Sequence, residues 1–437
     1  MSGFTWNEDQ QKAIDLIYKW YKDAFSATHF TLSGVAGSGK TTLAKYIAYE
    51  LLELYPEDVC FVAPTGKASN VLLSKGAFNC STIHKLIYDY FEVIEKEEIM
   101  GKRIPIRKKV FSKKPWLPLN IKLIICDEVS MVSDKMIDDL LSYGVKLLML
   151  GDIYQLPPVG FPMNKYISNP NYRLETIMRQ AEDNSILTVA MMAKNQKDIP
   201  YGKHGNNVYV EHKNSIMRDT FHKLLIKADQ VICGRKKTQR EINRLIRQLK
   251  GIDIYKEKYP TKGEKIICLN NSWDTFLDEG TCNYNLVNGS TGIVEDVKLL
   301  NDEQNIGKLT MLSDIVNSVS GTILFDTESF TNIEYEYEKK EAYVLSDDFA
   351  ILSGFDRQGK PREELIKYLD YVISAVELKQ VNAFDYGYAI SCHKSQGSEY
   401  GNVLVLDESD YFKEDKFKHL YTAITRCQKN LVILKGF

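Results

Sequence analysis

The stretch HFTLSGVAGSGKTT (residues 29–42) places a glycine-rich loop between an apolar, strand-like run and the start of a helix-like run. From Gly34 to Thr41 it matches the pattern G-x-x-x-x-G-K-T. Glycines in such a loop let backbone N–H groups wrap around phosphate oxygens, and the start of the following helix adds a favourable dipole. The stretch therefore predicts a phosphate-binding loop. A chance glycine-rich turn is the alternative, and the strand–loop–helix context disfavours it.

The polar groups of this loop have separate expected tasks. Lys40 is expected to reach the β- and γ-phosphates of a nucleotide, and the Thr41 hydroxyl is expected to hold Mg²⁺. The residues of the loop that we expect to contact the nucleotide and its metal are Gly34, Gly37, Gly39, Lys40, Thr41 and Thr42.

A second apolar run, LIICDE (123–128), ends on two adjacent carboxylates. In open α/β sheets ligands bind at the carboxyl ends of the strands. Asp127 is therefore predicted to hold Mg²⁺ through its water shell, and Glu128 to act as the base that polarises the attacking water. A pair of acids at a strand end is commonly just solvated. When the chain also contains a phosphate-binding loop, the pair of acids favours nucleotide hydrolysis over a kinase reaction.

The next apolar run leads into GDIYQLPP (151–158), where Gln155 follows the strand directly. This side chain is expected to contact the γ-phosphate or its attacking water. The alternative is an ordinary polar turn that is bounded by prolines.

Short apolar runs alternate with helical patterns along most of the chain, in two groups before and after about residue 180. This alternation predicts an α/β fold with two parallel sheets. Residues 85–116 alternate around a turn-like MGK and predict a β-hairpin, with Pro105 on an exposed edge. Residues 295–385 read as a β-rich insertion that contains one helix, REELIKYLDYVISAVEL (362–378).

Composition limits the classes of function. Hydrophobic residues make up 44% of 437 residues, so large cores are expected, and 56 basic against 58 acidic residues give a net charge of −2. A near-neutral total leaves nucleic-acid binding open, because binding needs only a local basic surface. None of the eight cysteines forms a C-x-x-C pair, which favours reduced core cysteines over disulfides or zinc. Without a signal peptide or a transmembrane run, a soluble cytoplasmic protein is expected.

The motifs taken together, in order, resemble those of superfamily 1 helicases, in the group that contains RecD and the Dda helicase of T-even bacteriophages. The matching stretches are WNEDQQKAI (6–14), GVAGSGKTT (34–42), APTGKAS (63–69), STIHKL (81–86), DEVS (127–130), GDIYQLPPVG (151–160), ETIMRQ (175–180), YAISCHKSQGSEYGNVLVL (388–406) and YTAITRCQKNLVIL (421–434).

The resemblance implies ATP and Mg²⁺ as cofactors and adds three site residues. Gln10 is expected to contact the adenine base. Arg179 and Arg426 are expected to stabilise charge on the transferred γ-phosphoryl group. A single arginine is usually a surface ion-pair partner, and only the paired motifs favour the catalytic role.

The resemblance also implies the domain plan. It consists of two RecA-like domains, the first with the hairpin insertion and the second with an SH3-like β-rich insertion. The expected boundaries are 1–84 with 117–180 for the first domain, 85–116 for the hairpin, 181–294 with 386–437 for the second domain, and 295–385 for its insertion.

Loops on the side away from the nucleotide are expected to contact DNA. Hydroxyl, amide and lysine groups suit phosphate oxygens without reading sequence. The basic run GKRIPIRKKVFSKKPW (101–116) suits backbone attraction with base stacking, although a solubilising surface is its alternative. The expected DNA contacts are Thr65, Lys67, His84, Phe111, Trp116, His393, Lys394, Ser395 and Gln396.

The resemblance thus implies an ATP-dependent DNA helicase that moves along single-stranded DNA, 5′ to 3′, in replication, recombination or repair. Because the sequence shows no further cluster of acidic residues with lysine beyond the nucleotide site, no nuclease activity is expected. Expected partners are single-stranded DNA, forked DNA, and single-strand-binding or replisome proteins, with the chain acting as a monomer away from membranes. The rivals are a translocase that displaces proteins with little unwinding, a nucleotide-gated DNA clamp, and a small-molecule kinase.

Overall fold

The computed structural model describes residues 6–99, 102–118, 120–158, 160–175, 184–254, 260–269, 272–276, 285–286, 288–301, 306–313, 318–326, 330–334 and 382–437. The chain divides into two compact units. The first comprises Met1–Tyr88, Lys113–Ile242 and Ala389–Phe437, and the second comprises Asp89–Ser112 and Asn243–Tyr388.

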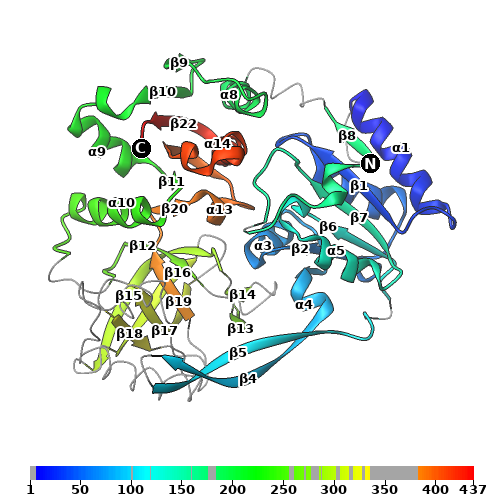
Figure 1. The fold of residues 1–437 in the computed structure, drawn as a ribbon, viewed down its shortest axis with the longest axis horizontal. Coiled ribbons are helices and arrows are strands. Elements are labelled where there is room, and N and C mark those ends of the chain that lie inside the picture. The colour runs from blue at the N-terminus through cyan, green and yellow to red at the C-terminus, as the bar shows by residue number, and fades with distance from the viewer. Residues whose placement is uncertain are drawn as a thin grey trace. The chain divides into compact units, whose positions relative to one another are not determined.

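The first unit contains two sheets, as the alternation of apolar runs predicted (Figure 1). The N-terminal sheet has six parallel strands in the order β3-β2-β6-β7-β1-β8. Its register places Ser33 beside Gly151, so the glycine-rich loop and the loop after β7 leave the sheet at the same edge. The strands are β1 His29–Gly34, β2 Val59–Ala63, β3 Cys80–Thr82, β6 Leu123–Cys126, β7 Lys146–Gly151 and β8 Tyr172–Leu174.

Helices cover both faces of this sheet, because alternate strand residues point to opposite faces. Phe61 and Ile125 pack on one face with α1 (Glu8–Lys22), α2 (Lys40–Lys45) and α3 (Gly66–Ser74). Val62 and Ile124 pack on the other face with α4 (Ile83–Ile87), α5 (Asp134–Leu141) and α6 (Lys165–Ser168). A π-helical segment, Tyr46–Leu51, continues α2, and short 3₁₀ turns span Pro56–Asp58 and Val129–Met131.

The second sheet has the order β20-β11-β21-β22-β10-β9, parallel except where β9 joins β10. Helices α8 and α14 share one apolar core with it. The strands are β9 Gly202–His204, β10 Val208–His212, β11 Gln230–Cys233, β20 Ala389–Ser391, β21 Tyr400–Asp407 and β22 Cys427–Lys435. The helices are α8 Ser185–Lys194, α9 Arg218–Lys227, α10 Lys236–Leu249, α13 Cys392–Ser395 and α14 Lys416–Ile424, with 3₁₀ turns at Lys213–Ser215 and Ser409–Asp415.

The second unit contains the predicted hairpin, formed by β4 (Tyr88–Ile99) and β5 (Lys102–Lys113) as a two-stranded sheet. It also contains a closed barrel, which bears out a β-rich insertion; its likeness to an SH3 fold stays a prediction. The barrel strands are β12 Lys265–Cys268, β15 Thr291–Asn301, β16 Ile306–Ser313, β17 Ser318–Asp326, β18 Phe330–Glu334 and β19 Asn382–Tyr386, and a separate pair is β13 Ser272–Phe276 with β14 Asn285–Leu286.

The barrel begins earlier in the chain than the expected boundary at residue 295. Strand β12 pairs with β15 and β19, and not with a strand of the second α/β sheet. A four-residue apolar run such as KIIC (265–268) does not reveal its partner, which explains the difference. The helix expected at 362–378 lies outside the described residues.

A buried ion pair joins the end of α10 to the start of the barrel. Arg247 donates to Glu264 through Nε at 2.8 Å and through its terminal nitrogen at 3.2 Å, and both side chains are at most 4% exposed. Thr261 donates its backbone N–H to the same carboxylate at 2.8 Å. Because every oxygen of this buried carboxylate has a donor, the pair holds α10 and β12 in a fixed relation.

None of the described helices combines the length and the apolar character needed to cross a membrane.

Candidate active site

A cavity of about 450 Å³ opens at the edge of the first sheet where the glycine-rich loop lies, a size suited to a small-molecule ligand. Elements of both sheets line it. From the first come the loop, α3, and the ends of β6 and β7; from the second come the segments before β21 and β22. The residues that line it include Gly37, Gly39, Lys40, Thr41, Thr42, Asp127, Glu128, Gln155, Glu399, Thr425 and Arg426.

The backbone of the loop is shaped as the glycines predicted. Gly37 and Gly39 have φ of +77° and +83°, which only glycine adopts without strain. A Cβ on Gly34 would lie 2.6 Å from the Ser38 hydroxyl, so this position too requires glycine. Lys40 lies across the loop, where its Nζ donates to the carbonyl oxygens of Gly34 at 2.7 Å and Val35 at 3.1 Å.

Gln10 contacts the loop from the first turn of α1. It forms a capping box with Asn7, in which each residue's backbone N–H donates to the other's side-chain oxygen. Its Nε2 then donates to the carbonyl of Ser38 at 3.1 Å. Gln10 is 1% exposed. In this structure its amide supports the glycine-rich loop, and its expected contact with adenine stays a prediction.

Thr41 and Asp127 lie together, as their expected shared metal requires. The Thr41 hydroxyl donates to Asp127 Oδ2 at 2.8 Å, and the backbone N–H of Glu128 donates to Asp127 Oδ1 at 2.8 Å. Glu128 has φ 52° and ψ 39°, a left-handed conformation that is uncommon outside glycine. Such local strain concentrates at functional sites.

The environment of Glu128 suits a base. Burial raises the pKa of its carboxyl above the ordinary value, and the negative charges of Asp127 and Asp152 act in the same direction. The positive charges of Arg426 and Lys40 oppose this change. A carboxylate with a raised pKa binds a proton more readily, which is the property that a general base needs.

Gln155 lines this cavity, and its side-chain oxygen is buried. The side chain is 4% exposed, and its Oε1 lacks a hydrogen-bond partner among the described residues. Buried acceptors are nearly always paired in folded proteins, so an acceptor without a partner in a residue that lines a cavity favours a ligand or an ordered water nearby. This agrees with the expected role of Gln155 beside the γ-phosphate.

Arg426 lies on the other side of the cavity and is 4% exposed. Its guanidinium donates to the carbonyls of Thr422 and Ser398, each at 3.2 Å, and to the Thr425 hydroxyl at 3.1 Å. These bonds fix the cation while its charge still acts on Glu128. The other expected arginine, Arg179, lies outside the described residues.

Sequence reasoning gave no role to Tyr421, which the structure places against the glycine-rich loop and the end of β7. Its hydroxyl donates to Asp152 Oδ2 at 2.5 Å and accepts the backbone N–H of Ala36 at 3.1 Å. Tyr421 stands in the stretch YTAITR (421–426), yet only its position next to the loop identifies the contact.

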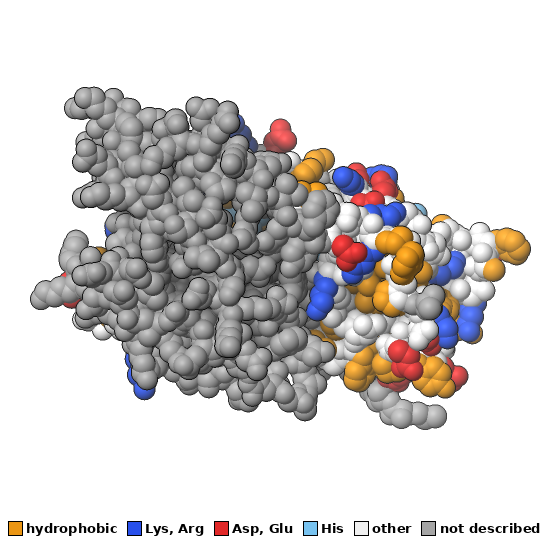
Figure 2. All heavy atoms as spheres, turned by 90° about the horizontal axis from the view of Figure 1, so that it is seen from below, with side chains coloured by type: hydrophobic (Ala, Val, Ile, Leu, Met, Phe, Trp, Pro, Cys, Tyr) orange, Lys and Arg blue, Asp and Glu red, His pale blue; other side chains and the backbone are white. Residues whose placement is uncertain are grey.

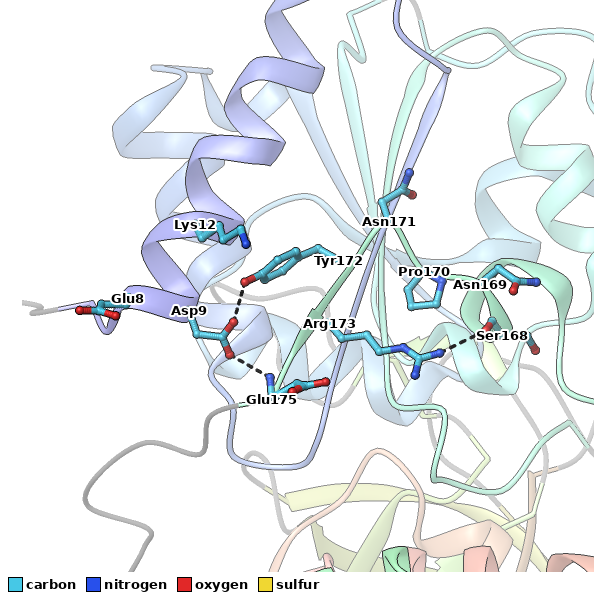
Figure 3. Close-up of a pocket in the computed structure, with 10 residues that line it drawn as sticks. All are labelled: Glu8, Asp9, Lys12, Ser168, Asn169, Pro170, Asn171, Tyr172, Arg173 and Glu175. Carbon is cyan, nitrogen blue, oxygen red and sulfur yellow. Dashed lines mark hydrogen bonds between the residues drawn. The ribbon is translucent and has the colours of Figure 1, made fainter.

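A second, larger cavity of about 840 Å³ lies over the start of α1 and β8 (Figure 3). Several of its polar groups are bonded to one another. Asp9 accepts hydrogen bonds from the Tyr172 hydroxyl at 2.7 Å and from the Glu175 N–H at 2.8 Å, and Arg173 donates to the Ser168 carbonyl at 3.4 Å. These contacts attach the first turn of α1, which carries Gln10, to β8.

The expected DNA contacts of the first sheet lie on α3 and α4. Thr65 caps α3 by accepting the N–H of Ala68 at 3.2 Å. Lys67 is 7% exposed and lies 5.6 Å from the Tyr400 ring centre. His84 is half-buried, and burial lowers its pKa. These polar groups thus have structural tasks, and their contact with DNA stays a prediction.

The expected contacts of the second sheet lie at the start and end of α13. His393 and Lys394 are partly exposed, and burial lowers the pKa of His393. Ser395 is fully buried and donates to the Cys392 carbonyl at 2.6 Å. Gln396 is 3% exposed and donates to the Leu156 carbonyl at 3.3 Å. In this structure neither Ser395 nor Gln396 offers its side chain to a backbone phosphate.

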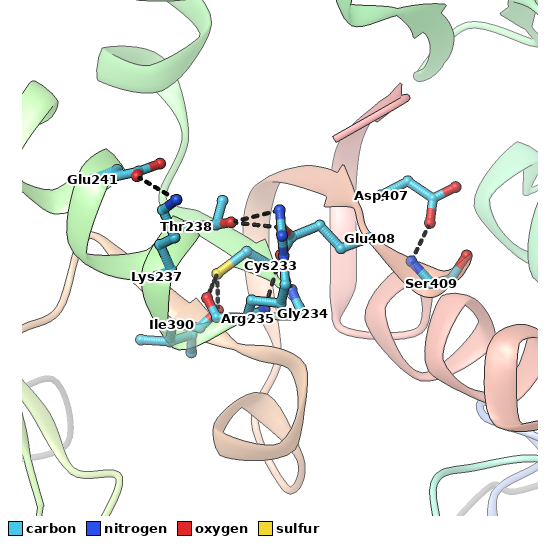
Figure 4. Close-up of polar contacts among 10 residues, drawn as sticks. All are labelled: Cys233, Gly234, Arg235, Lys237, Thr238, Glu241, Ile390, Asp407, Glu408 and Ser409. Atoms are coloured by element: carbon cyan, nitrogen blue, oxygen red, sulfur yellow. Dashed lines mark hydrogen bonds and ion pairs between the residues drawn. The ribbon is translucent and has the colours of Figure 1, made fainter. Parts of the chain in front are cut away.

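The buried carboxylate of Glu408 accepts hydrogen bonds from the turn between β11 and α10 (Figure 4). Glu408 accepts the N–H groups of Gly234 and Arg235 at 2.8 Å, the Arg235 Nε at 2.6 Å, and the Thr238 hydroxyl. Burial by itself raises the pKa of Glu408, but these hydrogen bonds outweigh it and hold the pKa below the ordinary value. The guanidinium of Arg235 lies 4.0 Å from the Tyr411 ring centre.

The two aromatic residues that were expected beside the basic hairpin are exposed. Phe111 is 49% exposed and Trp116 is 73% exposed. Exposed aromatic rings of this size suit stacking on bases. On the face shown in Figure 2 the described acidic and basic side chains are intermixed, without one continuous basic field.

The residues present fit ATP with Mg²⁺. Lys40 and the glycine-rich loop line the cavity, Thr41 and Asp127 supply hard oxygen ligands at one point, and Gln155 lines the same cavity. Oxygen donors are the ligands that Mg²⁺ prefers.

Two family models match the chain in succession. The family described as AAA domain matches residues 5–212, and the family described as UvrD-like helicase C-terminal domain matches residues 386–434. Together they cover more than half of the chain and include the segments that line the cavity.

Individual relatives agree with this assignment. The ATP-dependent RecD2 DNA helicase of Deinococcus radiodurans is 24% identical over 91% of this chain and 45% of its own length. The ATP-dependent DNA helicase dda of Enterobacteria phage T4 is 31% identical over 35% of this chain and 33% of its own. The fold matches a crystal structure of Pif1 helicase from Candida albicans with a TM-score of 0.50, 16% identity, and coverage of 99% of this chain and 95% of that one.

The chain spans less than half the length of several relatives, including 38% of an uncharacterised protein of Methanocaldococcus jannaschii that is 25% identical over 98% of this chain. The order of the motifs, the two α/β sheets and the matches to RecD, Dda and Pif1 proteins agree with one another. The chain belongs to the superfamily 1 helicases of the RecD, Dda and Pif1 type.

Proposed function

We propose that this chain is an ATP-dependent DNA helicase that translocates along single-stranded DNA in the 5′-to-3′ direction and couples ATP hydrolysis to duplex unwinding. One observation carries the proposal. A single cavity brings Lys40 and Glu128 of the first sheet together with Arg426 of the second. Hydrolysis residues from two sheets in one cavity make the reaction sensitive to how those sheets close.

The side chains divide the work of hydrolysis. Bound ATP with Mg²⁺ supplies the reactive phosphoanhydride bond and the cation that neutralises its oxygens. Lys40 and the loop N–H groups orient the phosphates, while Thr41 and Asp127 hold the metal. Glu128 accepts a proton from the attacking water, and Gln155 orients that water through Oε1.

Arg426 acts from the opposite wall of the cavity. A guanidinium there stabilises negative charge that develops on the transferred group. We propose the same role for Arg179. Because Arg426 belongs to the second sheet, its stabilising effect is strongest when the two sheets are closed on the nucleotide. Such differential contact is what allows a bound nucleotide to bias a conformational equilibrium.

DNA is the proposed track. One match of the fold is a Bacteroides Pif1 structure described as bound to ssDNA, with a TM-score of 0.50 and 18% identity over 98% of this chain and 92% of that one. We propose that Thr65, Lys67, His84, His393 and Lys394 contact the strand, with Phe111 and Trp116 stacking on bases. We propose that Ser395 and Gln396 only support this surface, because their side chains donate to the carbonyls of Cys392 and Leu156.

The direction of movement, the role in replication, recombination or repair, and the cytoplasmic location are parts of the same proposal and rest on the family resemblance. We propose a functional monomer without nuclease activity, acting on single-stranded and forked DNA and alongside single-strand-binding or replisome proteins.

The test is steady-state phosphate release with and without a single-stranded oligonucleotide, beside a Lys40→Ala control. At least tenfold stimulation by the oligonucleotide, abolished in the control, supports a DNA-dependent motor. Hydrolysis that ignores DNA would instead favour an unrelated nucleotide hydrolase or kinase. Stimulated hydrolysis without any strand separation would favour a translocase that displaces proteins.

A further inference from the structure

One hydroxyl group joins three segments that are far apart in the chain. Tyr421 is 1% exposed and lies on α14, which packs in the core of the second sheet. Its Oη donates to Asp152 at the end of β7 and accepts the N–H of Ala36 in the glycine-rich loop. The loop and the segment after β7 are therefore both bonded to one residue of α14, the helix that packs on the second sheet.

The next residues extend this connection. The Thr422 hydroxyl accepts the N–H of Leu156 at 3.0 Å, and Gln396 donates to the carbonyl of Leu156. Both backbone polar groups of Leu156 are thus bonded to the second sheet, directly beside Gln155. The segment 152–156 is held at its beginning by Tyr421 and at its end by Thr422 and Gln396.

Asp152 carries the electrostatic part of this arrangement. Asp152 is 1% exposed. The positive charges of Lys40 and Arg426 lower its pKa, and its own negative charge raises the pKa of Glu128. Burial raises the pKa of Asp152, while Lys40, the hydrogen bond from Tyr421, the N–H of Tyr154 and Arg426 lower it. Loss of the Tyr421 hydroxyl removes one of the groups that keep Asp152 ionised beside the Lys40 ammonium.

We propose that the Tyr421 hydroxyl is a positioning group of the active site, which keeps Ala36 of the glycine-rich loop and the segment 152–156 in one register with α14. ATP hydrolysis then depends on the position of α14 relative to the glycine-rich loop. Through α14, the second α/β layer controls where Lys40 and Gln155 lie, in addition to supplying Arg426. The proposal rests on the proposed ATP hydrolysis and adds to it a residue whose hydroxyl touches no substrate.

The ring of Tyr421 has a separate packing role that a variant can preserve. Its centre lies 6.3 Å from that of Tyr154 in an edge-on arrangement, within an apolar cluster. Tyr421→Phe keeps this packing and removes only the hydroxyl. If Tyr421 serves packing alone, the variant hydrolyses ATP as the wild type does.

The test compares full-length wild type, Tyr421→Phe and Tyr143→Phe in DNA-stimulated ATP hydrolysis at varied ATP and pH. Tyr143 is the matched control, because its hydroxyl donates to the Lys114 carbonyl at 2.6 Å and is absent from the cavity lining. We expect Tyr421→Phe to lower kcat about tenfold, in proportion to one charge-assisted hydrogen bond, with KM for ATP changed less than about threefold.

The pH dependence supplies a readout that packing alone would not move. Because the lost hydrogen bond lowers the pKa of Asp152, Tyr421→Phe raises that pKa, and the acidic limb of kcat shifts to higher pH. Tyr143→Phe leaves kcat and the limb unchanged. Equal kcat and an unshifted limb in Tyr421→Phe would overturn the proposal, whereas wild-type protein without DNA-stimulated hydrolysis would overturn the proposed function instead.

A double-variant cycle keeps the result decisive if Tyr421→Phe is less stable. Because Tyr421 acts partly through Asp152, Tyr421→Phe is expected to lower kcat by a smaller factor in the Asp152→Asn background than in the wild type. Independent, multiplicative losses in the double variant would contradict the proposed route through Asp152.

Discussion

Replacing Glu128 by glutamine isolates the chemical step from nucleotide binding. Glutamine has nearly the same shape as glutamate, so the side chain keeps its place in the cavity lining while the proton-accepting carboxylate is lost. A positioned general base contributes about 10²- to 10⁴-fold to a rate. At 1.36 kcal/mol for each tenfold change, this corresponds to about 2.7–5.4 kcal/mol of barrier. We therefore expect kcat to fall at least 100-fold.

Nucleotide affinity is expected to stay the same or to increase in this variant. Glu128 is one of three acidic groups in the cluster with Asp127 and Asp152. Removing one negative charge from a cavity that receives phosphates reduces repulsion, so the dissociation constant for ATP does not rise.

The assay is rapid phosphate release at saturating single-stranded DNA, with affinity measured by titration of a fluorescent ATP analogue. Glu211→Gln is the matched control, since Glu211 lies on β10 away from the cavity and is bonded to the Tyr209 hydroxyl at 3.0 Å. If Glu128→Gln hydrolyses ATP within tenfold of the wild-type rate, Glu128 is not the base.

Three further outcomes follow from particular contacts. Arg247→Met leaves the buried Glu264 carboxylate without its cation, so chemical denaturation is expected to show a free energy of unfolding lower by about 3–5 kcal/mol. The double variant Arg247→Met with Glu264→Leu is expected to have a stability near that of the wild type. A loss below about 1 kcal/mol in the single variant would contradict this. Burial raises the pKa of both Glu128 and Asp152, and both carboxylates must be ionised for hydrolysis, so a pH–rate profile is expected to lose kcat as pH falls through a value above the ordinary carboxyl pKa; a limb at or below about 4.3 argues against it. Because Trp116 is exposed, Trp116→Ala is expected to weaken single-stranded DNA binding by about 1–3 kcal/mol in a fluorescence titration. The free energy of unfolding is expected to stay within about 0.5 kcal/mol of the wild-type value. Unchanged DNA affinity would refute the stacking role.

Local chemistry made the first half of the site predictable. The spacing of Gly39, Lys40 and Thr41 requires one loop shape, and the apolar run before Asp127 requires a buried strand. In a parallel sheet both must end at the same edge, which is why the bond between Thr41 and Asp127 follows from sequence reasoning.

Contacts between distant segments could not be obtained in the same way. Tyr421 and Ala36 are 385 residues apart, and the helix pattern of α14 gives no sign that one buried hydroxyl serves another sheet. Short polar residues are equally uninformative. Ser395 and Gln396 were predicted to contact DNA, yet their side chains donate to the carbonyls of Cys392 and Leu156 inside the protein.

Strand partners were the other limit. An apolar run predicts a strand but not its neighbour, so the order β3-β2-β6-β7-β1-β8 and the place of β12 in the barrel needed the structure. The hairpin was easier, because two alternating runs around a short turn can only pair with each other.

Helicase activity and its direction can be measured together by strand separation of a fluorescent duplex. The duplex carries a single-stranded tail at either the 5′ or the 3′ side, and the assay contains ATP and Mg²⁺, with Lys40→Ala as the control. We expect opening of the 5′-tailed duplex alone, and loss of this opening in the Lys40→Ala control. Opening of the 3′-tailed duplex alone would contradict the proposed direction. No opening of either duplex, despite DNA-stimulated hydrolysis, would contradict the claim that this chain unwinds DNA.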